Sequence, residues 1–468
     1  MSTEAATPTA PLDGFVTSVD PSSGEQIARH PLHDGAAVDA ALERARTTQR
    51  RWWEAGFERR AETLRGFAQA LRDDREQLAA LITAEMGKTL REARAEVEKS
   101  AWACEHYAEH GAAMLAREPI EAGWSETYVQ FPPLGVVLAV MPWNYPVWQV
   151  MRAAAPALMA GNAIVLKHAS NVTGCALRLA ETLARVEPGL VEVVVAAGRD
   201  VAALIADERI AAVTLTGSEG AGVAVATACA RALKPSVLEL GGSDPFVVLA
   251  DADVEAAAAT AVRARFSNTG QSCVAAKRFI VVEAVADAFE EAFAAAAGRL
   301  SLGDPREEVD LGPMARVDLR DELAGQVARG LAAGGRVLVG GTVPERPGAW
   351  YPPTVVGGVA PDSPLAREET FGPAAAVLRV PDEAAAIALA NASPYGLSSS
   401  LWSRDVERAK GLARRIEAGA VFVNTMTASD PRVPFGGVKR SGWGRELGSF
   451  GIREFVNVQA VTVAPRRL

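Results

Sequence analysis

From Leu134 onward, short apolar runs without polar alternation are separated by helical segments, and this order most strongly restricts the fold. We expect strands at 135–140, 163–166, 191–195 and 212–215. Uninterrupted apolar strands are typical of parallel sheets, because helices cover both faces of such sheets. The sequence therefore predicts an α/β fold that binds ligands at the carboxyl ends of its strands. Helices are expected between the strands, at 152–159, 171–185 and 202–206.

The flanking segments extend this prediction. Residues 34–118 carry apolar residues at three-to-four spacing and are predicted to form a helical scaffold. A second α/β block begins near Gly241, with strands expected at 246–249, 279–282 and 420–423. The last strand-like segment, 456–463, is suited to extend a neighbouring sheet, which makes a homo-oligomer plausible.

Length and charge exclude several classes of function. A chain of 468 residues suits two large domains with a cleft between them. The formal net charge is −9 and no dense cluster of Lys and Arg is present, so nucleic-acid binding is not expected. Prolines interrupt the charge-free stretch 127–151, which argues against a membrane-spanning helix. Residues 1–20 lack the pattern of a secretory signal or transit peptide, so a cytoplasmic protein is predicted.

The cysteines are expected to be free thiols, because they show no regular spacing and the predicted compartment is reducing. Cys104, His106 and His110 can be drawn as a metal site on one helix, but no further ligand is evident. No metal is therefore predicted.

Cys273 is the candidate nucleophile. It follows a run of small polar residues, 267–272, which leaves the sulfur reachable. Lys277 and Arg278 lie just downstream, and nearby cations can lower the pKa of a thiol. The alternative is an ordinary buried cysteine that acts as a small hydrophobic residue.

Three further residues suit chemistry at such a thiol. Asn144 lies in a proline-bounded turn, where its amide can hold an oxyanion or cap the following helix. Glu239 ends an apolar run, so its pKa is raised if it is buried, and it then suits a general base. Lys167 closes the strand at 163–166 and can reach a nucleotide, although a solvated lysine is equally compatible.

The strand that ends at Thr216 leads into Gly217, Ser218 and a helix that contains Gly222. Backbone N–H groups at such a helix start can bind an anion. The turn has neither the G-x-G-x-x-G pattern nor that of a P-loop, and a plain strand-to-helix turn explains it as well.

Taken together, these motifs resemble the aldehyde dehydrogenase superfamily from about residue 15 to the C-terminus, in the same order and at the same spacing. The motifs that carry the resemblance are 142–146, 216–218, 238–242, 270–273, 369–373 and 434–437. The resemblance implies an atypical Rossmann-like cofactor domain, an α/β catalytic domain and a small oligomerisation β-extension. It assigns 1–118 and 134–239 to dinucleotide binding, 240–445 to catalysis, and 119–133 with 446–468 to oligomerisation.

The resemblance also implies a mechanism. The thiolate of Cys273 attacks an aldehyde, and Asn144 with the backbone N–H of Cys273 holds the oxyanion. Hydride passes to the nicotinamide ring, and water activated by Glu239 then hydrolyses the thioacyl enzyme. The implied cofactor-binding residues are Trp143, Lys167, Ser170, Gly217, Ser218, Gly222, Glu369 and Phe371.

NAD or NADP is predicted as the hydride acceptor, with NAD slightly favoured. NAD-specific members often carry a glutamate that repels a 2′-phosphate, but Ser170 stands at that position here. Arg199 can even attract a 2′-phosphate.

Within the superfamily, segments 167–171, 428–432 and 442–447 most resemble bacterial succinate-semialdehyde dehydrogenases. The implied substrate is a short aldehyde that ends in a carboxylate. Arg152 and Ser429 occupy the places of residues that bind this carboxylate. A second arginine of those enzymes is replaced by Ser267, and Arg432 is the predicted substitute.

Three other functions stay open. A dehydrogenase of neutral or amino aldehydes would use Arg152 only structurally. An acylating enzyme that uses coenzyme A is disfavoured, because Glu239 is present to activate water. A noncatalytic protein that keeps the fold is disfavoured by the intact catalytic residues. The predicted assembly is a homodimer or homotetramer.

Overall fold

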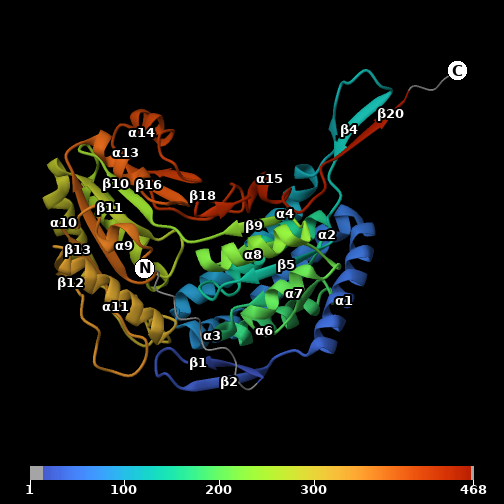
Figure 1. Cartoon of the computed structure of the whole chain (residues 1–468), viewed down its shortest axis with the longest axis horizontal. Coiled ribbons are helices and arrows are strands. Elements are labelled where there is room, and N and C mark those ends of the chain that lie inside the picture. Colours follow the sequence, from blue (N-terminus) through green and yellow to red (C-terminus); the bar gives the residue numbers. More distant parts are fainter. Residues whose placement is uncertain (1–13, 465–468) are drawn as a thin grey trace.

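The structure is a computed structural model that describes residues 14–464, and within them two large sheets form the core (Figure 1). Each sheet lies between layers of helices, and most neighbouring strands run parallel. The α/β fold with two blocks, predicted from the apolar runs, is therefore confirmed.

The first sheet has the strand order β19-β9-β8-β5-β6-β7, and all its neighbours are parallel except β19 and β9. Its strands are β5 (Val136–Met141), β6 (Ala163–His168), β7 (Val191–Val193), β8 (Ile210–Thr216), β9 (Ser236–Glu239) and β19 (Gly442–Trp443).

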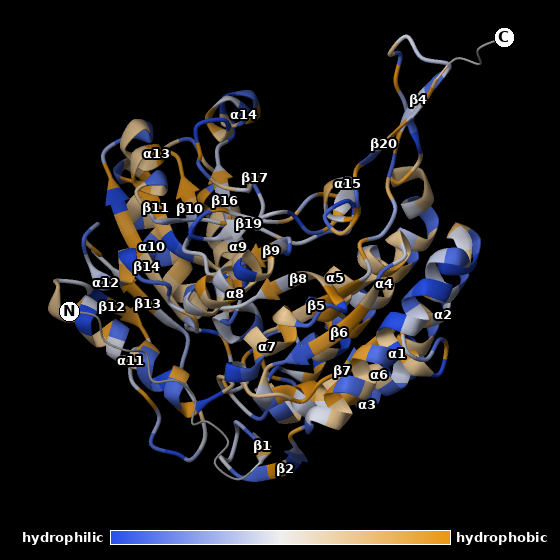
Figure 2. Cartoon of the chain, turned by 45° about the vertical axis from the view of Figure 1, so that its right-hand side comes forward, coloured by the Kyte–Doolittle hydropathy of each residue, from blue (hydrophilic) through white to orange (hydrophobic). Residues whose placement is uncertain are grey.

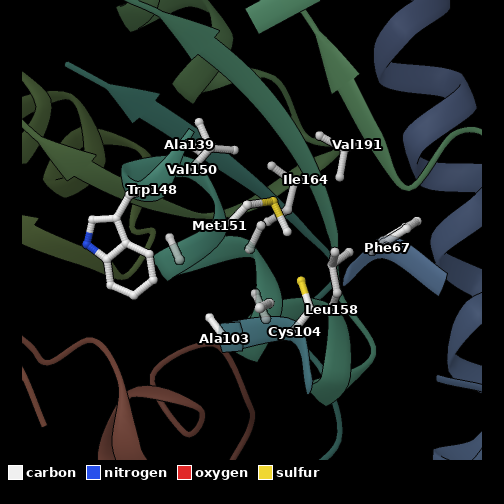
Figure 3. Close-up of a cluster of buried hydrophobic side chains, with 14 of the residues drawn as sticks. Phe67, Ala103, Cys104, Ala139, Trp148, Val150, Met151, Leu158, Ile164 and Val191 are labelled. Atoms are coloured by element: carbon white, nitrogen blue, oxygen red, sulfur yellow. The ribbon is translucent and has the colours of Figure 1, made fainter. Parts of the chain in front are cut away.

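Successive residues of β5 point to opposite faces of this sheet. Val137 and Ala139 pack against the helices α2 to α6, whereas Val136 and Leu138 pack with α1, α7 and α8. Figure 3 shows Met151 and Leu158 of α5 among buried side chains of neighbouring elements. The helices are α1 (Gly35–Glu54), α2 (Gly56–Asp73), α3 (Arg75–Met86), α4 (Leu90–Met114), α5 (Trp148–Ala160), α6 (Thr173–Ala184), α7 (Val201–Ala206) and α8 (Glu219–Ala232).

The second sheet has the order β12-β13-β14-β11-β10-β16-β17, and only β12 pairs antiparallel. Figure 2 shows much of β10 and β11 in the colour of hydrophobic residues, and every residue of β10, β11 and β16 is buried. The strands are β10 (Asp244–Val248), β11 (Ala276–Val282), β12 (Arg336–Val339), β13 (Thr354–Gly357), β14 (Ala374–Val380), β16 (Ser398–Trp402) and β17 (Ala420–Val423). The covering helices are α9 (Val254–Phe266), α10 (Glu283–Ala297), α11 (Val317–Ala332), α12 (Pro364–Arg367), α13 (Glu383–Asn391) and α14 (Val406–Ala413).

A small sheet extends away from the body of the molecule (Figure 1). It contains β3 (Glu118–Pro119), β4 (Glu126–Gln130) and β20 (Gln459–Val463), so the predicted C-terminal strand pairs with a segment of its own chain.

The remaining elements are short. They are β1 (Phe15–Val19), β2 (Gln26–Pro31), β15 (Tyr395–Gly396), β18 (Val438–Lys439), α15 (Gly448–Gly451) and the 3₁₀ turns η1 (Ser170–Val172), η2 (Gly198–Asp200) and η3 (Ser267–Gly270).

The chain passes between the two sheets more than once. The predicted limit at 239/240 falls between β9 and β10. The chain then returns to the first sheet at β19, inside the segment predicted as catalytic. The charge-free stretch 127–151 forms most of β4, all of β5 and the start of α5. No helix within residues 14–464 is long and apolar enough to cross a membrane.

Candidate active site

Cys273 lies between two cavities, each of about 260 Å³, and lines both of them. The α5 cavity is lined by residues of α4, α5 and the loop 426–429. The α11 cavity is lined by residues of α11 and of the turns that follow β5 and β8. The side chain of Cys273 is partly exposed, whereas Cys104, Cys175 and Cys229 are buried. Cys273 therefore lines both cavities, as expected for a reachable residue, although its thiol is largely removed from bulk water.

The expectation of a lowered thiol pKa is wrong for this structure. Burial raises the pKa of Cys273 to about 12, although Arg152 and Lys277 oppose the shift. The ammonium of Lys277 donates to the carbonyl oxygen of Cys273 at 2.8 Å. Arg278 donates instead to the carbonyl oxygens of Ser243, Leu389 and Ala390. Removing the thiol from water therefore outweighs the nearby cations.

Asn144 is held against the loop of the nucleophile. It is buried, and its Nδ2 donates to the carbonyl oxygen of Gln271 at 3.0 Å. It does not cap α5, because Oε1 of Glu96 accepts from the backbone N–H groups of Val147 and Trp148 at 2.8 and 3.0 Å. The helix-cap alternative is thus absent, and the amide faces the α11 cavity.

His168 fixes the same turn from the other side. Its Nδ1 accepts from the backbone N–H of Ala169 at 2.9 Å, so Nε2 carries the hydrogen and donates to the carbonyl oxygen of Pro146 at 2.8 Å. Burial lowers the pKa of His168 to about 4, which keeps the ring neutral. The Asn144 turn is therefore anchored at both ends.

Glu239 ends β9 and is only 2% exposed. Neither carboxylate oxygen has a hydrogen-bond partner among the described residues. Burial, and then the charge of Glu446, raise the pKa of Glu239 to about 8, while Arg152 and Arg445 oppose the shift. The raised pKa expected for a buried Glu239 is confirmed.

A buried ion pair joins Arg152 to Glu446 beside this carboxyl group. The guanidinium of Arg152 also donates to Oγ1 of Thr216 at 3.1 Å and lies 4.6 Å from the ring centre of Phe435. Arg152 lines the α5 cavity, but Glu446 already balances much of its charge. The sequence analysis assigned no role to Glu446, although it lies within the family-like segment 442–447.

The α11 cavity contains most of the predicted cofactor-binding residues. Phe371 and Trp143 stand edge to face there, with ring centres 5.7 Å apart. Oε1 of Glu369 accepts from the backbone N–H of Gly242 at 2.9 Å and lies 3.5 Å from Nζ of Lys277. The cavity is lined by Trp143, Gly217, Ser218, Glu369 and Phe371.

Lys167, Ser170 and Gly222 do not line this cavity. Lys167 and Ser170 lie farther along the same edge of the first sheet, in β6 and η1. A Cβ atom at Gly222 would lie 2.6 Å from Cδ1 of Leu240, so this glycine allows α8 to approach Leu240.

These residues fit a dinucleotide. Ser218 caps α8, whose first-turn N–H groups face the carboxyl edge of the sheet, and Gly217 brings no side chain to that turn. The crossed aromatic rings suit a flat nicotinamide next to the sulfur. The adjacent edge of the sheet leaves Lys167 in reach of a ribose.

The α5 cavity has a polar end. Ser429 accepts a hydrogen bond from Nζ of Lys99 at 2.8 Å, and both residues line the cavity with the exposed Ser267. Arg432 does not line it, because its guanidinium pairs with Asp430 at 2.6 Å and is 67% exposed. The structure therefore brings Arg152 and Ser429 to the cavity, but not Arg432.

The sequence analysis missed the polar stripe on α4. Lys88 precedes the helix, and Glu92, Glu96 and Lys99 follow at helical spacing, so all four line the α5 cavity. Their spacing of three and four residues places them on one face of the helix, and this spacing was the sequence feature that could have indicated them.

Cys104, His106 and His110 do not form a metal site. Cys104 belongs to the hydrophobic core, while the rings of His106 and His110 pack 4.8 Å apart. Within residues 14–464, no group of three or more His, Cys, Asp or Glu is arranged to hold a metal ion.

Comparison with known proteins identifies a matching family and relatives that are similar over nearly the whole chain. A family model described as "Aldehyde dehydrogenase family" matches residues 10–461. The chain is 50% identical over 447 residues to "Succinate semialdehyde dehydrogenase [NAD(P)+] Sad" of Escherichia coli K12, covering 95% of this chain and 97% of that protein. It is 46% identical to "Succinate-semialdehyde dehydrogenase [NADP(+)] 1" of Mycobacterium tuberculosis H37Rv, covering 96% of this chain and 100% of the relative.

Solved structures share the fold over nearly the whole chain. The succinic semialdehyde dehydrogenase of Streptococcus pyogenes in complex with NADP+ superposes with a TM-score of 0.94 at 34% identity, covering 96% of this chain and 100% of that one. PnpE in complex with nicotinamide adenine dinucleotide gives a TM-score of 0.92 at 34% identity, covering 97% and 95%.

Proposed function

Because the chain belongs to the aldehyde dehydrogenase family, we propose that it oxidises succinate semialdehyde to succinate with NAD+ or NADP+. The observation that supports this most directly is the position of Cys273 between two cavities. One cavity ends in Lys99 and Ser429, which suit an anionic tail, and the other has aromatic walls that suit a nicotinamide.

Cys273 is the proposed nucleophile. Its thiol must first lose its proton, and the positive charges of Arg152 and Lys277 favour the thiolate. The sulfur then bonds to the aldehyde carbon, and the carbonyl oxygen becomes an oxyanion. Asn144 Nδ2, together with the backbone N–H of Cys273, donates to that oxyanion. Its present bond to Gln271 uses one of its two N–H groups.

When bound, NAD(P)+ accepts the hydride that leaves the former aldehyde carbon. The carbon then remains as a thioester on Cys273. In the proposed second half-reaction, Glu239 takes a proton from water, and the resulting hydroxide attacks the thioester carbon. The carbon–sulfur bond breaks, succinate leaves, and the sulfur is restored. The free oxygens of Glu239 are suited to this proton transfer.

The proposed cofactor contacts are the lining residues of the α11 cavity, with Lys167 and Ser170 at the adenosine end. Ser170 has no negative charge to repel a 2′-phosphate. Arg199 lies in η2 after β7, the strand that pairs with β6, and it is 61% exposed and 3.8 Å from Asp200. The relatives' names include both NAD(P)+ and NADP+. The slight preference for NAD+ stays a prediction.

Steady-state assays with an aldehyde panel and both cofactors test the proposal. Succinate semialdehyde should give a higher kcat/KM than butanal or betaine aldehyde. A preference for betaine aldehyde or butanal would instead favour the neutral or amino aldehyde function. Failure to reduce either cofactor with any aldehyde would contradict the dehydrogenase itself.

We also propose a cytoplasmic homodimer or homotetramer. The small sheet of β3, β4 and β20 stands away from the body and supports an interface with a second copy of this chain (Figure 1). Its surroundings expose apolar side chains, including Ile120, Trp124, Val458 and Val463. The four cysteines form no disulfide in the described structure, which agrees with the proposed cytoplasmic location.

A further inference from the structure

Lys99 is a partly buried lysine at the wall of the α5 cavity. It lies near the middle of α4, where its Nζ stands 4.5 Å from the ring centre of Trp148 and donates to Ser429. Within residues 14–464, no carboxylate lies at ion-pair distance from Lys99. The other buried cations of this cavity differ, since Lys88 pairs with Glu96 and Arg152 pairs with Glu446.

The charge of Lys99 is therefore only partly balanced. Burial lowers the pKa of Lys99 to about 8, and the positive charge of Arg152 adds to this shift. Asp430 and Glu96 oppose it, but each already pairs with another cation, Arg432 and Lys88. A cation that is partly removed from water and has no carboxylate partner is destabilised, and an anion that enters the cavity relieves this cost.

The polar end of the cavity is built for a small carboxylate. The hydroxyl of Ser429 accepts one N–H of Lys99, which leaves the other ammonium hydrogens and the hydroxyl hydrogen available to acceptors. Both residues share the cavity with Cys273, so an aldehyde that reacts with the thiol has the rest of its chain in the same cavity.

The other cations of the cavity are less suited than Lys99 to bind a carboxylate. Arg263 also lines it but is exposed, where solvent and salt screen its charge. Arg152 is held by Glu446, and Ser267 carries no charge.

We propose that Lys99, together with Ser429, binds the substrate carboxylate and selects acidic aldehydes. This inference rests on the proposed function. Lys99 thereby supplies, from α4, the cation that the sequence lacks at Ser267.

The test compares KM for succinate semialdehyde and for butanal in the wild type and in Lys99→Met. A hydrogen bond to a charged group contributes about 1.5–3 kcal/mol. In Lys99→Met, the KM for succinate semialdehyde divided by the KM for butanal should therefore rise about 10- to 100-fold. Lys99→Arg should restore most of the selectivity, since it keeps the charge. Lys410→Met, which removes an exposed lysine on α14, should leave the ratio unchanged.

A pH profile provides a second readout. As pH rises through about 8, Lys99 loses its proton, so the wild-type KM ratio should rise as selectivity is lost. In Lys99→Arg the ratio should stay flat, because the guanidinium does not titrate there. The other charged groups around Lys99, which act in both proteins, are Lys88, Glu92, Glu96, Arg152, Arg263 and Asp430, and Asp430 is paired with Arg432.

The outcomes separate the two proposals. A wild type that prefers succinate semialdehyde, with a Lys99→Met variant that raises both KM values equally, would overturn the role of Lys99 alone. A wild type with no preference for the acidic aldehyde would overturn the proposed function and this inference together.

Discussion

Glu239 meets two opposing requirements at the scale of a single residue. A general base must be ionised, but burial and the negative charge of Glu446 favour its neutral form. The positive charge of Arg152 opposes this rise in the pKa of Glu239, and Arg152 also forms an ion pair with Glu446. Replacing Arg152 would therefore affect Glu239 as well as any contact with substrate. A test of the predicted substrate role of Arg152 must separate these effects by measuring KM and kcat independently.

The pKa of Glu239 sets an expected pH dependence. Below about pH 8 the carboxyl group is protonated and cannot accept a proton from water, so hydrolysis of the thioester should speed up as pH rises through this value. Glu239→Gln should retain a single burst of NADH or NADPH but lose about 100- to 10,000-fold in turnover. Rapid-mixing absorbance and steady-state rates measure both quantities. A variant with undiminished turnover would show that another group activates the water.

At the scale of elements, α4 supports the turn that carries Asn144. The carboxylate of Glu96 accepts from two N–H groups at the start of α5 and pairs with Lys88. Donors at a helix start that lack a side-chain cap from the helix itself need such a partner. The orientation of Asn144 thus depends on a residue about fifty positions earlier in the chain.

Glu96→Ala should lower the unfolding temperature by about 5 °C or more, because it leaves both N–H groups and the Lys88 ammonium without their buried partner. Glu109→Ala, on an exposed part of the same helix, should change it by less than about 1 °C. Scanning calorimetry of the two variants makes the comparison. An unfolding temperature of Glu96→Ala equal to that of the wild type would contradict the role assigned to this carboxylate.

At the scale of the whole molecule, the two sheets meet around Cys273, while the small sheet lies apart. The exposed apolar side chains around this sheet are not covered by their own chain, and a second copy would bury them. The proposed interface therefore uses a different part of the molecule from the catalytic cavities.

Trp124→Glu should reduce the assembly to a smaller mass, because it places a charge in the proposed interface, where the tryptophan is 56% exposed in the single chain. Leu233→Glu, at a 93% exposed apolar position beyond the end of α8, should keep the wild-type mass. Light scattering during gel filtration determines these masses. An unchanged mass for Trp124→Glu, or a monomeric wild type, would contradict this interface.

The order of strands and helices and the candidate nucleophile could both be predicted from the amino-acid sequence. Apolar periodicity is a local property, so β5, β6 and β8 could be predicted from it. Cys273, Asn144 and Glu239 could be proposed because each lies in a short motif at the end of a strand or in a turn.

Most of the charges that act on these residues come from segments far apart in the chain, so they could not be predicted from the sequence. The raised pKa of Cys273 follows from burial between two cavities, which no neighbouring residue in the sequence reveals. Lys99 and Glu96 looked like ordinary polar positions of a helical scaffold, and they reach the site because α4 packs against α5. Local patterns specify elements, whereas pKa values and ion pairs depend on distances between segments far apart in the chain.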